Sequence, residues 1–107
     1  MRFMIAAILG TGLAGTSMAA DLDAGRKIAE AQCAACHGKD GKTAADPAYP
    51  KLAGQYPDYL AKALNDYQSG GRKNAIMGGM AKPLSKQDIQ NLAAYFSSLP
   101  GPLTHRR

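Results

Sequence analysis

The chain has 107 residues, a formal net charge of +5 and a hydrophobic fraction of 46%, with no tryptophan. Residues 21–107 contain only eight leucines, three isoleucines and Phe96 as large aliphatic or phenylalanine side chains, and no valine. So few large apolar side chains exclude a second domain and a sheet built on β-branched residues. They are also too few to fill the core of a domain of this size. We therefore expect something other than side chains to complete the core.

Residues 1–20 have the pattern of a secretory signal peptide. A basic residue precedes an apolar stretch, which ends in small residues just before the first acid. Ser17 and Ala19 favour cleavage after Ala19, and cleavage after Ala20 is the alternative. An uncleaved membrane anchor fits less well, because a spanning helix needs about 20 apolar residues. We expect residues 21–107 to form a soluble domain exported to a bacterial periplasm.

The exported part of the chain predicts an all-α domain with three principal helices. The first spans residues 21–36, which include good helix formers, acidic residues in the first turn and no proline. The stretch 38–54 is rich in Gly, Pro, Asp and Lys and lacks a hydrophobic period, so it is predicted as a loop.

The second helix starts near Pro57, where apolar residues recur at i, i+3 and i+4 until a pair of glycines. Residues 72–84 are predicted as another loop. Ser85 and Asp88 form a capping-box variant that opens the last helix, and Pro100 stops that helix. Loops this long in a small domain usually carry function.

The motif at residues 33–37 is C-x-x-C-H, the attachment signature of a c-type haem. Cys33 and Cys36 can each add to a haem vinyl group, and His37 then becomes the proximal iron ligand. A redox dithiol is less favoured because the chain lacks a βαβ setting. A plain disulfide is another alternative, and a zinc site would have to recruit His105 from the tail and still lack a fourth ligand.

A haem with one histidine needs a second axial ligand or an open site. Met77 and Met80 are the methionines outside the leader, and a thioether sulfur suits the iron of an electron carrier. Two glycines between them would let the backbone approach a flat cofactor. Spacing alone does not choose between the two, and either could simply pack against the ring. If neither binds, the site is open, as in a haem enzyme or a gas sensor.

On these residues the chain resembles a class I cytochrome c, and in detail the small bacterial monohaem cytochromes that are similar to single domains of the dihaem "c-four" group. The resemblance covers residues 23–99. Its motifs are Asp23–Lys27, Cys33–Gly38, Tyr49–Gln55, Met77–Ala81 and Leu84–Phe96.

The resemblance implies a class I cytochrome c fold, with three principal helices and long loops wrapped around one covalently bound haem. It implies that Gly25 lets the first and last helices cross closely, opposite Leu92 and Tyr95. The domain assignment is then a signal peptide at residues 1–20 and a cytochrome c domain at residues 21–107.

For the site, the resemblance implies that Met77 rather than Met80 binds the iron. It also implies that the Pro50 carbonyl accepts the Nδ1 proton of His37, a bond that fixes the ring orientation and basicity of a metal-bound histidine. Leu52 is then expected to line the haem pocket.

The function implied is that of a periplasmic one-electron carrier with one haem c and His/Met axial ligation, not an enzyme. The alternative is the cytochrome subunit of a periplasmic redox enzyme, such as a flavocytochrome sulfide dehydrogenase. Expected partners are membrane oxidase or reductase complexes or a flavoprotein dehydrogenase, with transient docking at a membrane surface at most. Nucleic acid is not expected, because the basic residues are not interleaved with stacking aromatics.

Charge supports this choice of partners. Residues 21–107 carry twelve Lys or Arg and eight Asp or Glu, which leaves +4. Such cations can steer a protein toward acidic docking surfaces, although ordinary surface scatter would give a similar count. The cations that follow the haem motif or flank the methionines are Lys39, Lys42, Lys51, Arg72, Lys73 and Lys82.

Overall fold

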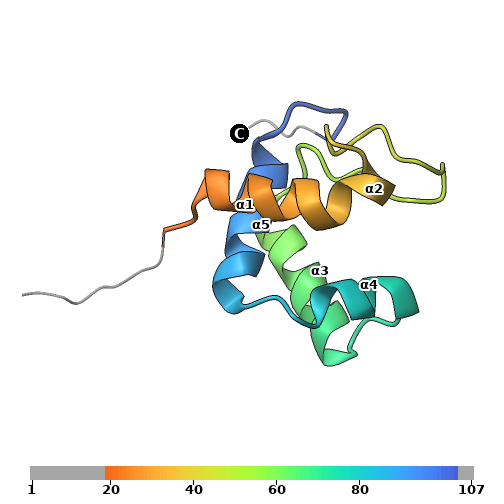
Figure 1. Cartoon of the computed structure of the whole chain (residues 1–107), viewed down its shortest axis with the longest axis vertical. Helices are drawn as coiled ribbons and strands as arrows, with labels where there is room; N and C mark the ends of the chain where they lie inside the picture. The colour runs from red at the N-terminus through yellow and green to blue at the C-terminus, as the bar shows by residue number, and fades with distance from the viewer. Residues whose placement is uncertain (1–18, 104–107) are drawn as a thin grey trace, which may run out of the picture.

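The computed structural model describes residues 19–103, and every regular element in that range is helical (Figure 1). The elements in chain order are α1 (Leu22–Ile28), the π-helical segment η1 (Ala29–Cys33), α2 (Ala34–His37), α3 (Pro57–Ser69), α4 (Ala75–Ala81) and α5 (Lys86–Ser98). The all-α fold predicted from the sequence is therefore confirmed. Residues 1–18 of the predicted signal peptide, and His105, lie outside the described residues. No helix within residues 19–103 is long and apolar enough to cross a membrane.

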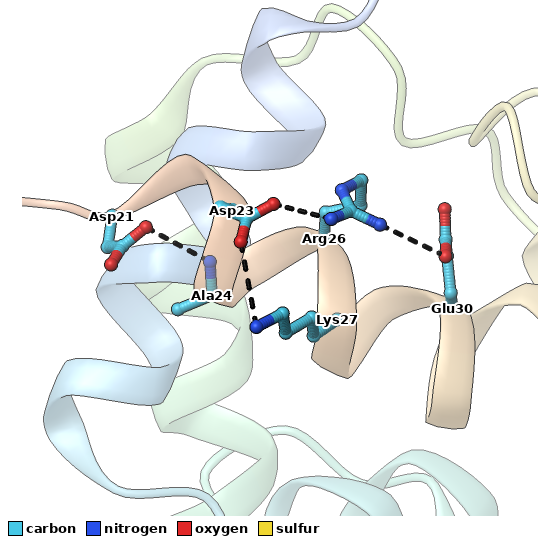
Figure 2. Close-up of polar contacts among 6 residues, drawn as sticks. All are labelled: Asp21, Asp23, Ala24, Arg26, Lys27 and Glu30. Carbon is cyan, nitrogen blue, oxygen red and sulfur yellow. Dashed lines mark hydrogen bonds and ion pairs between the residues drawn. The ribbon is translucent and has the colours of Figure 1, made fainter.

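The first three elements follow one another without a break and form a single helical run (Figure 1). Asp21 caps its start, where the side chain accepts a hydrogen bond from the Ala24 amide at 3.0 Å. On its exposed face Arg26 lies between Asp23 and Glu30 (Figure 2). Exposed pairs of this kind contribute little to stability. The run matters because it carries the cysteine motif at its C-terminal end.

The helical run crosses α5 at Gly25. A Cβ built on Gly25 would overlap the Asn91 carbonyl oxygen and lie 3.0 Å from the Cβ of Tyr95. The close crossing expected at Gly25 is confirmed, although the nearest atoms belong to Asn91 and Tyr95 rather than to Leu92. Asn91 is itself buried, and its Oδ1 accepts hydrogen bonds from the Asp21 amide and from Gln87 Nε2, both at 2.8 Å.

The hydrophobic core lies between the helical run, α3 and α5, and it is small. Its buried members are Ala29, Leu60, Leu92, Ala93 and Phe96. The start of α5 is fixed by the predicted capping box, in which the Asp88 amide donates to Ser85 Oγ and the Ser85 amide donates to the Asp88 carboxylate. A core with two alanines among five members agrees with the shortage of large apolar residues in the sequence.

The prediction of a loop at residues 72–84 is wrong over its central part, where α4 (Ala75–Ala81) forms and packs on α3 (Figure 1). Two glycines led to the loop prediction, because each makes a helix less favourable by about 1 kcal/mol relative to alanine. The signal that was missed is Asn74, whose Oδ1 accepts hydrogen bonds from two amides of the first turn.

Candidate functional site

The two cysteines of the motif lie at the end of the helical run. Both are half-buried and neither is in a disulfide, so the disulfide alternative has no support. Burial raises the pKa of the Cys33 thiol to about 11, which keeps that thiol protonated at neutral pH. Within residues 19–103 no group of three or more His, Cys, Asp or Glu side chains could hold a metal ion, which leaves the zinc alternative without a ligand set there.

His37 ends α2 and is buried, with 7% of its surface exposed. Its Nδ1 lies 2.9 Å from the Pro50 carbonyl oxygen. Because a carbonyl can only accept, this bond selects the tautomer with the proton on Nδ1. The lone pair of Nε2 is then the one available to a metal ion.

The loop 38–54 reaches back to the motif and brings Pro50 to His37. The Ala45 amide donates to the Cys36 carbonyl at 2.9 Å, and the amides of Leu52 and Ala53 donate to the Gly41 carbonyl at 2.7 and 3.0 Å. Gly41 has a φ of 75°, a conformation that favours glycine. These bonds fold residues 38–54 across the end of the helical run, and we call this folded loop the strap.

Asp40 organises the first turn of that strap. Its carboxylate accepts hydrogen bonds from the amides of Lys42 and Thr43 and from the Thr43 hydroxyl, at 2.9, 2.8 and 2.6 Å. The Thr43 hydroxyl, followed by the two amides, lowers the pKa of the carboxyl group to about 2. Asp40 is therefore ionised at neutral pH.

A partly open apolar hollow adjoins Cys33, and the space within it is about 260 Å³ when the open solvent at its mouth is included. Its walls come from the helical run, α3, α4, the turn after α4, and α5. The lining residues are Ile28, Gln32, Cys33, Leu64, Met77, Met80, Ala81, Leu84 and Leu92. The structure therefore brings both candidate methionines to the same hollow as Cys33.

The other residues singled out from the sequence are placed differently. Cys36, His37 and Pro50 do not line this hollow. Leu52 is half-buried and packs against the core cluster rather than lining the hollow.

Sequence reasoning did not single out Ile28, Gln32, Leu64 or Leu84 as part of the site. Ile28 and Gln32 are four residues apart on the helical run, so they lie on neighbouring turns of one face. Leu84 lines the hollow from the turn after α4, and α4 was not predicted from the sequence.

The two methionines differ in exposure. Met77 is half-buried, whereas 39% of the Met80 surface is exposed. Two residues apart on a helix are separated by about 200°, so Gly79 lies on the face of α4 opposite Met77. Gly79 is exposed, and a Cβ built there would meet no protein atom of residues 19–103 within 4 Å.

These features fit a covalently attached haem. The hollow is apolar, and the residues that line it include a cysteine with a free thiol and two methionines of α4. A buried imidazole with its Nδ1 already engaged by a carbonyl is what a proximal ligand requires. The small protein core agrees with a domain that a large apolar group completes.

Comparison with known proteins agrees with this chemistry. Residues 22–100 match the family model for cytochrome c. The cytochrome c4 of Stutzerimonas stutzeri is 44% identical over 111 residues, which cover 94% of this chain and 51% of that protein. The cytochrome subunit of sulfide dehydrogenase from Chlorobaculum tepidum is 36% identical over 73 residues, covering 68% of this chain and 64% of that protein.

Among solved structures, the crystal structure of reduced recombinant cytochrome c4 from Pseudomonas stutzeri superimposes with a TM-score of 0.71 at 46% identity. The match covers 78% of this chain and 47% of that chain. The chain thus spans about half the length of the cytochrome c4 relatives that it matches.

Proposed function

The chain belongs to the cytochrome c family, and on that premise we propose that it is a periplasmic one-electron carrier whose haem iron is bound by His37 and Met77. Its cofactor is one haem c, attached through Cys33 and Cys36. The bound haem supplies an iron that can hold or release one electron. The observation that carries the proposal is that Cys33 and Met77 line the same apolar hollow.

Each residue of the proposed site has a defined task. His37 presents Nε2 to the iron, because its Nδ1 is engaged by the Pro50 carbonyl. That bond also prevents the imidazole from rotating. The apolar walls exclude water, and exclusion of water together with a thioether ligand raises the reduction potential.

Met77 is proposed as the second axial ligand in preference to Met80. In its support, Met77 is half-buried in the wall of the hollow, whereas Met80 has 39% of its surface exposed. In addition, the backbone amide of Met77 is fixed by a hydrogen bond to Asn74 at 3.0 Å. We assign Met80 to the rim of the hollow.

The surface around α4 is proposed to meet redox partners. Ile76 is 63% exposed beside the exposed Met80, and Arg72, Lys73 and Lys82 are exposed close by in sequence. A partly apolar patch flanked by cations suits the acidic docking surface of an oxidase, a reductase complex or a flavoprotein dehydrogenase. The rate of electron transfer to such a partner is expected to fall as ionic strength rises.

Periplasmic residence is proposed from the leader. Residues 1–20 have the charge, apolar stretch and small residues of a cleaved signal peptide. Cleavage of this leader after Ala19 or Ala20 would release the cytochrome c domain into the periplasm.

A second candidate function is that of the cytochrome subunit of a periplasmic redox enzyme. It is favoured by the similarity to the cytochrome subunit of sulfide dehydrogenase. Purification of the protein from its native host separates the two: a carrier is recovered alone, and a subunit is recovered with a flavoprotein.

The test of the proposed function is an anaerobic redox titration of the purified haem protein, followed by exposure of the ferrous form to carbon monoxide. We expect a single reversible one-electron transition and no binding of carbon monoxide, because both axial positions are filled. Rapid binding of carbon monoxide would identify an open-site haem protein instead.

A further inference from the structure

Gln68, in the last turn of α3, reaches across to the end of α4. Its side-chain Nε2 donates to the Leu84 carbonyl at 2.6 Å and to the Ala81 carbonyl at 3.0 Å. The Lys82 carbonyl is a more distant third acceptor at 3.4 Å. The last carbonyls of a helix have no partner inside the helix, so an amide group that carries two hydrogens suits this position.

The helix that Gln68 contacts cannot hold its shape by itself. α4 has seven residues, two of them Gly78 and Gly79, and Ala81 is its buried residue. Helices this short are marginal in water, and each glycine weakens them further. Asn74 caps the N-terminal end through the amides of Ile76 and Met77. At the C-terminal end the Leu84 amide donates to the Ala81 carbonyl at 3.0 Å, and the amide that α3 supplies is a second donor to that carbonyl.

The contact bears directly on the site. Ala81 is fully buried and lies one helical turn after Met77, and both line the apolar hollow. An amide that fixes the Ala81 carbonyl therefore fixes the rotation of α4 and the direction in which Met77 projects. The Leu84 amide also donates to the Ala81 carbonyl, so Gln68 links α3 to a turn whose two ends are already joined by a backbone bond.

We propose that Gln68 is a positioning residue for the methionine ligand: by holding the carbonyls of Ala81 and Leu84, it keeps α4 turned so that Met77 stays bound to the iron. This inference rests on the proposed His37 and Met77 ligation. Loss of the amide donors should loosen α4 locally while the cysteine motif, the strap and the core remain in place.

Two variants remove the donors in different ways. Gln68→Glu keeps the shape of the side chain but turns a donor into a charged acceptor facing carbonyl oxygens. Gln68→Leu removes the donors without adding charge. The matched control is Asn65→Asp, which makes the same amide-to-carboxylate change on α3 at an exposed residue whose Nδ2 donates to the Ala61 carbonyl of its own helix.

The measurement is titration of the ferric haem protein with imidazole, a ligand that competes for the methionine position. Loss of the sulfur-to-iron absorption band reports displacement of the methionine, and a parallel denaturant titration reports global stability. Both Gln68 variants should lose the band at an imidazole concentration roughly tenfold below that of the parent, the effect expected when the Leu84 carbonyl loses its side-chain donor and the Ala81 carbonyl loses one of its two donors. Asn65→Asp should behave as the parent does.

The outcomes separate this inference from the function on which it rests. Absence of the sulfur band in the parent protein would overturn His37 and Met77 ligation, and the inference with it. A band in the parent that resists imidazole equally in both Gln68 variants would overturn the inference alone. Failure of both variants to retain covalent haem would also overturn it, because Gln68 would then support the whole domain rather than the position of α4.

Discussion

The backbone amide of Met77 donates a hydrogen bond to the side chain of Asn74 at 3.0 Å, so the residue that caps α4 also holds the backbone of the proposed iron ligand. The Ile76 amide donates to the same oxygen, also at 3.0 Å. The short helix that presents the methionine is thus fixed at its start by Asn74 and at its end by Gln68.

Replacing Asn74 by alanine should loosen the start of α4. The loss of an N-cap costs about 1 kcal/mol, which corresponds to a roughly fivefold loss of protection in the first turn. Amide hydrogen exchange of Ile76 and Met77 in the haem protein measures this effect. Asn74→Asp keeps an acceptor oxygen and serves as the control. Equal protection in the alanine and aspartate variants would show that the cap does not hold α4.

A methyl group added at Gly25 should destabilise the whole domain. Alanine is the better helix former, but the added Cβ would overlap the Asn91 carbonyl oxygen, and overpacking of this kind typically costs about 1–3 kcal/mol. The denaturation midpoint of the haem protein measures the cost.

Gly79→Ala is the matched control for that substitution. The built Cβ meets no atom within 4 Å, so the same change should raise helix propensity in α4 and stabilise it by up to about 1 kcal/mol. If both substitutions shifted the midpoint in the same direction, the close crossing of α1 and α5 would not limit stability.

The folding free energy should depend on the protonation of Asp40 in acid. Because the strap lowers the pKa of this carboxyl from its ordinary 3.8 to about 2, its contribution is complete above about pH 4 and is lost as the pH falls toward 2. Denaturant unfolding at several pH values between 2 and 5 measures it.

Two variants test the Asp40 prediction. Asp40→Asn should flatten the pH dependence over that window, and Thr43→Val, which removes the hydroxyl donor, should flatten it in part. An unchanged slope in Asp40→Asn would assign the acid sensitivity to other carboxylates.

The features set by neighbouring residues were predictable from the sequence. The C-x-x-C-H motif and the capping box at Ser85 and Asp88 each follow from residues a few positions apart. The helix crossing at Gly25 was expected only through the resemblance to a known family. The helix α4 was not predictable from propensity, because its two glycines outweigh the cap at Asn74.

Contacts between segments that lie far apart in the sequence could not be predicted from residue spacing. Gln68 lies 13 residues before Ala81 and 16 before Leu84, and the bond between them exists only because α4 packs on α3. The bond from His37 to Pro50 also spans 13 residues. It was expected only through the resemblance to a known family, because nothing in the loop composition determines which carbonyl reaches the imidazole.

Without covalent attachment of the haem, the domain should not fold. The buried core contains few large side chains, so the double variant Cys33→Ala and Cys36→Ala should be largely unfolded and rapidly degraded. Circular dichroism during thermal melting measures this, with the parent haem protein as the reference. A cooperative, native-like melt of the double variant would refute the view that haem completes the core.

The central claim is that His37 and Met77 would together hold the haem iron, and the ferric absorption spectra of Met77→Ala and Met80→Ala test it most directly. Both methionines line the hollow, so the two substitutions remove similar apolar volume from the same place. We predict that Met77→Ala abolishes the sulfur-to-iron band and opens the site to carbon monoxide, while Met80→Ala retains the band. Retention of the band in Met77→Ala, or its loss in Met80→Ala alone, would contradict the assignment.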